Sequence, residues 1–101
     1  MRKVKKLPPI HPGEILKDEI DELGLTANAM ALALRIPSNR LTEIINGKRG
    51  ISADTAMRLA RYFGTSAQMW MNLQSHYELE VAEHDLAERI AREVQPLRKA
   101  S

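Results

Sequence analysis

The 101-residue chain is predicted to fold as one all-α domain of five helices, the last of them long. Three observations predict this class. Its apolar residues are mainly Leu, Ile, Met and Ala, and aromatic residues make up only 4% of the chain, whereas strands favour β-branched and aromatic side chains. The apolar positions recur at helical spacing, and no alternating stretch is long enough for a strand. Glycine, proline and capping hydroxyl residues divide the chain into segments of helical length.

Composition and charge narrow the possible functions. The chain has no cysteine, which excludes a disulfide scaffold and thiolate metal sites. No apolar run approaches the ~20 residues of a membrane span, and no signal peptide follows the basic start, so we expect a cytoplasmic protein without a membrane partner. The formal net charge is only +2, but residues 39–61 are basic and residues 78–93 are acidic. This segregation suggests a polyanion partner at one end and a different partner at the other, although ordinary surface variation can produce it too.

The first predicted helix follows a basic segment. Residues 1–10 (MRKVKKLPPI) carry four cations and two prolines, and we expect them to form a flexible arm. Pro12 suits a first helical position, so the helix is predicted to begin there and to end before Gly24. His11 is expected to help cap it. The predicted inward positions of this helix are Ile15, Leu16, Ile20 and Leu23.

Two short helices are predicted next, joined by about four residues. Thr26 is a good N-cap for the first of them, and Pro37 interrupts the chain before a helix over about 38–46, which Asn46 and Gly47 end. A short amphipathic helix that follows another in this way, and leads into a basic turn, describes a helix-turn-helix. The residues that fit this packing are the small Ala31 in the middle of the first helix and the apolar Leu34, Ile36 and Leu41.

The exposed face of the helix over 38–46 carries polar groups that can meet base edges. An asparagine amide can bond adenine, an arginine can bond guanine or reach a phosphate, and a glutamate can accept from cytosine. The predicted base contacts are Ser38, Asn39, Arg40, Thr42 and Glu43. Phosphate contacts are predicted for Lys48 and Arg49 and for the start of the preceding helix, Thr26 to Asn28. A solvated helix face can carry the same residues, so a helical protein-interaction module remains an alternative.

One residue of the turn fits this motif badly. The turn usually contains a glycine in the left-handed conformation, but Arg35 occupies that position. A residue with a side chain costs about 1 kcal/mol there. Either the turn differs in shape, helped by Pro37, or the strain is tolerated.

The last two helices are predicted from their caps. Ser52 caps a helix that ends at Gly64, and Ser66 caps a long helix that persists until Pro96. The long helix has two apolar seams, which four small helices rarely cover completely, and an exposed seam usually marks an interface, so we expect a homodimer. The alternative is that the start of the first seam completes a monomer core and the helix frays beyond it. The first seam consists of Trp70, Leu73, Tyr77 and Val81, and the second of Leu79, Ala82, Leu86 and Ile90.

The chain resembles a known family over about residues 8–83. The runs PPIHPGEILKDEI, GLT and IPSNRLTEIINGKRGISADTAMRLARYFGTSAQMWMNLQSHYELEVAE are similar to the HigA family of antitoxins, also called VapI-like, within the Xre/Cro-type helix-turn-helix superfamily. The segments NGKRGISADTA and FGTS…W.NLQ…Y are much more specific than a generic helix-turn-helix. The resemblance implies a lambda-repressor-like fold and a dimeric repressor that binds a pseudo-palindromic operator near its own promoter. It also implies neutralisation of a HigB-type toxin, an mRNA-cleaving ribonuclease.

Carried onto this sequence, the resemblance implies the same five base contacts and places the dimer interface in the C-terminal helical part. The implied interface residues are Trp70, Leu73, Tyr77 and Val81. The implied DNA backbone contacts are Thr26, Asn28, Asn46, Lys48 and Arg49. An orphan Xre-type regulator, or a helical interaction module without a toxin, would look the same in sequence.

The expected organisation is a DNA-binding domain over 11–75 and a C-terminal extension over 76–101 for dimerisation and possible partner contact. We expect no enzyme, because the chain has no Gly-rich phosphate loop and no recognisable pairing of a nucleophile with a base. No cofactor or metal is expected either. The stripe of His76, Glu80, Glu83 and His84 matches no zinc motif and is interpreted as solvated or facing the dimer partner.

Overall fold

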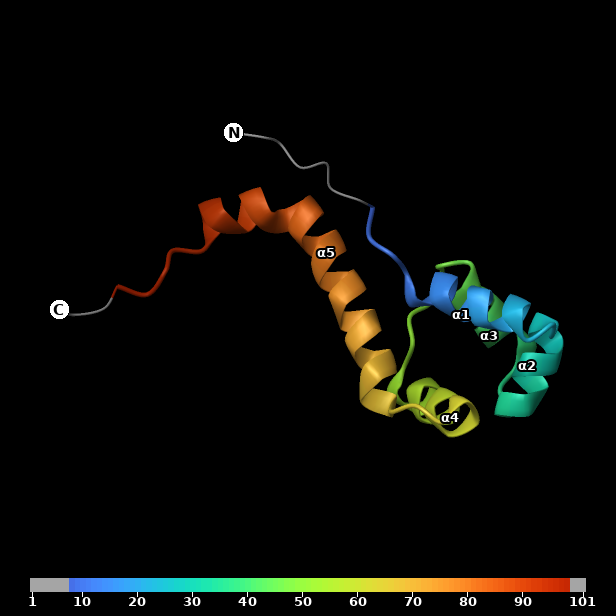
Figure 1. The fold of residues 1–101 in the computed structure, drawn as a ribbon. Helices are drawn as coiled ribbons and strands as arrows, with labels where there is room; N and C mark the ends of the chain where they lie inside the picture. Colours follow the sequence, from blue (N-terminus) through green and yellow to red (C-terminus); the bar gives the residue numbers. More distant parts are fainter. Residues whose placement is uncertain (1–7, 99–101) are drawn as a thin grey trace, which may run out of the picture.

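The computed structural model describes residues 8–98, and within them the chain forms five helices and no strand. The predicted all-α class with a long last helix is confirmed. Figure 1 shows the first four helices gathered against the start of the fifth, whose remainder extends away from them. Residues 1–7 of the predicted arm lie outside the described residues. The helices are α1 (Pro12–Glu22), α2 (Ala27–Leu34), α3 (Ser38–Ile45), α4 (Ala53–Phe63) and α5 (Ala67–Glu93).

Side-chain caps set the helix starts that the sequence predicts. The hydroxyl oxygens of Thr26, Ser52 and Ser66 each accept a hydrogen bond from the backbone N–H three residues further on, at 3.0–3.3 Å. At α1 the Nδ1 atom of His11 accepts from the backbone N–H two residues on, at 2.9 Å, and the Glu14 carboxylate accepts from the His11 N–H at 3.1 Å. The two bonds form a capping box, which confirms the predicted role of His11.

A single apolar core joins all five helices. One predicted core residue, Leu23, is half exposed instead, because α1 ends at Glu22 and Leu23 follows in the turn. Gly13 allows α1 to approach α3 closely, since a Cβ atom there would overlap the carbonyl oxygen of Ile44. The buried apolar residues are Leu16, Ile20, Met30, Ala31, Leu34, Ile36, Leu41, Ile44, Ile51, Ala56, Leu59 and Trp70.

The first seam of α5 packs on the domain. Trp70 is 2% exposed, its indole N–H donates to the Thr65 hydroxyl at 2.9 Å, and its ring lies 5.9 Å from that of Phe63. Trp70 is therefore a core residue of the single chain, covered by the end of α4 and the α4–α5 turn, and its predicted place in a dimer interface stays a prediction. Leu73 and Tyr77 are half-buried against the domain.

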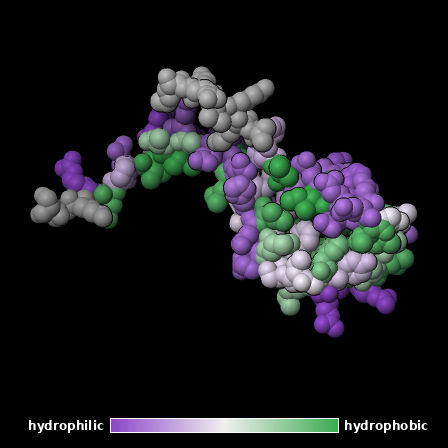
Figure 2. All heavy atoms as spheres, in the orientation of Figure 1, coloured by the Kyte–Doolittle hydropathy of each residue, from purple (hydrophilic) through white to green (hydrophobic). Residues whose placement is uncertain are grey.

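The second seam of α5 lies on the surface. Leu79 is 68% exposed, Leu86 39% and Ile90 49%. The helix does not fray after Tyr77, since it continues to Glu93. Figure 2 shows hydrophobic side chains gathered along the part of α5 that projects from the domain. Among residues 8–98, no helix is long and apolar enough to span a membrane.

Candidate nucleic-acid interface

The turn between α2 and α3 contains a strained residue. Arg35 has φ 61° and ψ 42°, the left-handed conformation, and it is the one residue other than glycine with positive φ in the described range. The backbone N–H groups of Arg35 and Ile36 still bond carbonyls of α2, at 3.2 and 3.0 Å. The turn therefore does not differ in shape. It keeps the left-handed position without a glycine, and the strain at Arg35 is tolerated.

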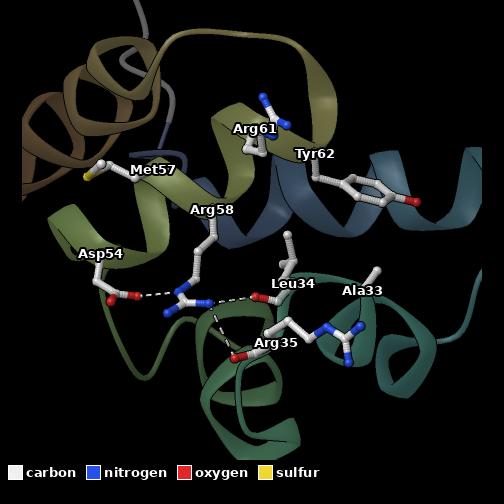
Figure 3. A pocket seen from close by; sticks show the side chains of 8 residues that line it. All are labelled: Ala33, Leu34, Arg35, Asp54, Met57, Arg58, Arg61 and Tyr62. Atoms are coloured by element: carbon white, nitrogen blue, oxygen red, sulfur yellow. Dashed lines mark hydrogen bonds and ion pairs between the residues drawn. The ribbon is translucent and has the colours of Figure 1, made fainter.

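An arginine of α4 braces this turn. The guanidinium of Arg58 donates to the carbonyl oxygens of Leu34 and Arg35 at 3.1 and 3.4 Å, and to the carboxylate of Asp54 at 2.6 Å (Figure 3). These contacts line a groove of about 430 Å³ between the end of α2 and α4. The hydrogen bond from Arg58 is the main reason why the pKa of Asp54 lies below its ordinary value. The brace satisfies carbonyls at the end of α2 that have no partner within the helix.

Recognition helix α3 presents one polar face. Leu41 and Ile44 on its other face are fully buried, which fixes the rotation of the helix. Ser38, Asn39 and Thr42 are exposed. The structure therefore brings the predicted base-contacting residues of α3 together on the surface, where short polar side chains can reach another molecule.

The start of α2 lies beside this face. The Ser38 hydroxyl donates to the Asn28 amide oxygen at 2.6 Å, which joins a predicted base contact to a predicted backbone contact. The exposed Thr42 donates its hydroxyl back to the Ser38 carbonyl at 3.0 Å, within α3. The Thr26 side chain caps α2, as described above, while neighbouring N–H groups at the helix start can face an anion.

Two of the predicted base contacts are ion-paired in the free protein. Glu43 accepts from the guanidinium of Arg49 at 2.8 Å, so it holds this cation beside α3. Arg40 lies 3.6 Å from the carboxylate of Asp54, the same group that Arg58 binds. Both pairs are largely solvated, and such pairs contribute roughly 0–1 kcal/mol each, so DNA can compete for the arginines.

A basic loop (46–51) follows α3 and carries the other predicted phosphate contacts. Gly47 has φ +75°, and the Lys48 N–H bonds the Glu43 carbonyl at 2.8 Å, which ends α3 and turns the chain. Lys48 and Arg49 are exposed, whereas Ile51 is buried in the core. Asn46, at the C-cap of α3, is exposed on the same loop.

Elements outside the helix-turn-helix hold this loop. The Ile51 N–H donates to the side-chain oxygen of Gln74 in α5 at 2.8 Å. His11 lies under the loop, with its ring 4.7 Å from that of Tyr77 and close to Gly47. Burial of the imidazole lowers the pKa of His11.

The sequence reasoning missed Gln74, Asp54 and Arg58. For Gln74 a signal was present: it falls four residues after Trp70 and three before Tyr77, so it is a polar residue on the buried seam. The pairing of Asp54 with Arg58 follows helical spacing, but their contacts with α2 and α3 do not show in the sequence. No group of three or more His, Asp or Glu side chains within 8–98 is placed to hold a metal ion.

The site consists of the exposed polar face of α3, the braced turn before it, the cationic loop after it and the start of α2 beside it. This arrangement defines a helix-turn-helix domain of the DNA-binding class. Residues 16–70 match the helix-turn-helix family. Virulence-associated protein I of Dichelobacter nodosus is 52% identical over 81 residues, which cover 79% of this chain and 75% of that protein.

Solved structures narrow the family further. An addiction module antidote protein of the HigA family from Coxiella burnetii superposes with a TM-score of 0.87 at 48% identity, over 90% of this chain and 100% of that one. Pseudomonas aeruginosa antitoxin HigA, solved with the higBA promoter, gives 0.85 at 49% identity, over 89% and 99%. The chain belongs to the HigA-type, VapI-like family of helix-turn-helix antitoxins, as its resemblance predicts. This is a family of DNA-binding regulators and not of enzymes.

Proposed function

We propose that this chain is an autoregulating repressor that binds an operator near its own promoter and also neutralises a HigB-type toxin. The observation that carries the proposal is the exposed polar face of α3, braced from α4 and flanked by the start of α2 and the basic loop. The similar Pseudomonas aeruginosa HigA has been solved with promoter DNA, which supports a DNA ligand for this face.

In the proposed complex, α3 lies in the major groove. Asn39 is the most direct candidate for base reading, because it is exposed and its side chain has no hydrogen bond within residues 8–98. Arg40 exchanges the Asp54 carboxylate for a base or phosphate, and Glu43 reads a base or keeps Arg49 in place. Ser38 and Thr42 complete the base contacts. The proposed backbone contacts are Thr26, Asn28, Asn46, Lys48 and Arg49.

We propose a homodimer that pairs through the projecting part of α5. The exposed Leu79, Leu86 and Ile90 supply an apolar surface there, whereas the half-buried Val81 belongs to the first seam on the other face of α5. Leu73 and Tyr77 are already packed on the domain, so they support the interface and do not form its centre. A two-fold dimer predicts half-sites about 34 Å apart on the operator.

The toxin partner is proposed from the family and from charge. Residues 78–93 are rich in carboxylates, and a ribonuclease must present cations to bind RNA, so the two surfaces are complementary. The division into a DNA-binding domain over 11–75 and a partner-binding extension over 76–101 is part of the same proposal.

The test is fluorescence anisotropy with duplex DNA from upstream of the gene and a scrambled duplex. We expect the upstream DNA to bind at least ~10³-fold more tightly, with two protomers per site. Asn39→Ala and Arg40→Ala should remove that preference, and Asn72→Ala, an exposed asparagine on α5, should keep it. Equal, weak binding to both duplexes would refute the operator proposal and favour the alternative of a protein-interaction module.

The phosphate contacts have a separate test. Lys48→Ala should weaken binding to both duplexes alike and reduce the slope of log affinity against log salt by about one unit per protomer. Lys17→Ala removes the same charge from α1, where Lys17 pairs with Asp21, and is the matched control. A slope that changes equally in both variants would show a long-range charge effect and remove Lys48 from the contacts.

A further inference from the structure

We infer that Gln74 is a positioning residue for DNA binding: its amide fixes the basic loop so that Lys48 and Arg49 are presented to the phosphate backbone. Gln74 lies on α5, outside the helix-turn-helix, and touches no DNA in the proposed complex. The inference rests on the proposed function, since it explains how the DNA-binding face keeps its shape.

The buried amide makes two hydrogen bonds. Gln74 is 6% exposed although it is polar, and its Oε1 atom accepts from the Ile51 N–H at 2.8 Å. Its Nε2 atom donates to the Glu78 carboxylate at 2.8 Å, which sets the orientation of the amide. A buried polar group is tolerated only with its partners in place, so the amide and the loop backbone depend on each other.

Gly50 allows the loop backbone to lie close to the Gln74 amide. A Cβ atom at Gly50 would lie 2.8 Å from Nε2 and 2.9 Å from Cδ of Gln74, closer than real Cβ atoms come. The loop backbone therefore lies directly against the end of this side chain. An alanine at position 50 would push the amide away from Ile51 without changing any residue of α5.

The Gln74 amide holds the end of the cationic segment (48–50) that leads into α4. On the α3 side, the Lys48 N–H is bonded to the Glu43 carbonyl. On the α4 side, the Ile51 N–H is bonded to Gln74. Lys48, Arg49 and Gly50 lie between these two bonds and are exposed. Without the second bond the segment has more conformations, and binding must then supply the free energy to order it.

The experiment measures the salt dependence of operator binding together with the melting temperature. Gln74→Met keeps the size of the side chain but removes the acceptor, and Gly50→Ala displaces it from the loop side. Each should reduce the salt slope by about one to two units per protomer, as phosphate contacts are lost. The double variant should lose no more than either alone, because both break the same bond.

Two controls separate positioning from general destabilisation. The exchanged pair Gln74→Glu with Glu78→Gln keeps an acceptor for Ile51, a donor between the two side chains and the total charge, so the parent slope should return. Gln68→Met makes the same substitution on the exposed side of α5 and should leave the slope unchanged.

The possible results distinguish a failure of the proposed function from a failure of the positioning role of Gln74. If the parent does not prefer operator DNA, the proposed function fails. If the parent binds but Gln74→Met lowers only the melting temperature and keeps the salt slope, the positioning role is overturned. It is also overturned if the exchanged pair loses as much of the salt slope as Gln74→Met does. Should Gln74→Met not fold, Gly50→Ala decides by the same criterion.

Discussion

Replacing Arg35 with glycine is expected to stabilise the domain. Arg35 adopts φ 61° and ψ 42°, and its side chain has no hydrogen bond within residues 8–98. The left-handed conformation costs a residue with a Cβ atom roughly 1–2 kcal/mol. Glycine removes that cost but adds freedom to the unfolded chain, which costs about 0.4–1 kcal/mol. The net gain should be about 0.5–1 kcal/mol, or a rise of roughly 2–8 °C in melting temperature for a domain of this size.

Two further variants isolate the backbone effect. Arg35→Ala removes the side chain but keeps the strain, so it should be close to the parent. Gly64→Ala makes the reverse change at the C-cap of α4, where φ is +73° and a Cβ atom would meet nothing within 4 Å. It should cost about as much as Arg35→Gly gains.

Urea unfolding followed by circular dichroism measures these differences. The carbonyls that Arg58 binds are backbone atoms and remain in every variant, so the turn should keep its shape. If Arg35→Gly is no more stable than Arg35→Ala, strain at this turn does not reduce stability, and the reasoning from φ and ψ is refuted.

Four other predictions concern the core, the exposed seam of α5 and the junctions of the fold. Trp70→Ala should destabilise the domain by about 3–5 kcal/mol, measured by thermal melting, whereas Ile90→Ser should give folded monomers by light scattering. Gly13→Ala should cost about 1–3 kcal/mol or more in urea unfolding, because its Cβ atom overlaps the carbonyl oxygen of Ile44; a neutral result would mean that α1 moves freely. The lowered pKa of His11 means that the folded state binds fewer protons than the unfolded chain, so stability is complete above the ordinary histidine range and is lost as the pH falls through it. His11→Asn keeps a capping oxygen without a titrating group and should flatten this loss between about pH 7 and pH 5, measured by melting at each pH.

The helix boundaries could be predicted because their causes are local. Thr26, Ser52 and Ser66 each bond a backbone group three residues away, and Gly64 ends α4 in the left-handed conformation. These interactions are fixed by neighbours in the sequence. Leu23 shows the limit: the helical period places it inward, but the helix stops one residue before it.

The two seams of α5 could not be ranked from the sequence. Both contain apolar residues at helical spacing, and the positions of α4, the α4–α5 turn and the start of α1 decide which one is covered. Trp70 meets Phe63 and Thr65, so the first seam belongs to the core, while Leu79 meets nothing comparable. The burial of Trp70 therefore depends on residues of α4 and of the α4–α5 turn, which helical spacing within α5 does not reveal.

The DNA-binding face shows the same division between local and distant causes. The exposed residues of α3 follow from its period, since Leu41 and Ile44 fix the opposite side. The contacts that hold the face in place join residues more than twenty positions apart, as with Arg58 and Leu34 or Gln74 and Ile51. No pattern in the sequence specifies such pairs.

These distant contacts hold both ends of the face in the protein without DNA. The brace from α4 holds the turn at the start of α3, and the amide from α5 holds the loop at its end. Ordering a long side chain on binding costs about 0.5–1.5 kcal/mol, so a face that is already ordered keeps more of its contact energy as affinity. Substitutions at Arg58 or Gln74 should consequently lower DNA affinity although neither residue lies on the recognition helix. The DNA-binding unit is thus larger than the helix-turn-helix and includes the helices that support both of its ends.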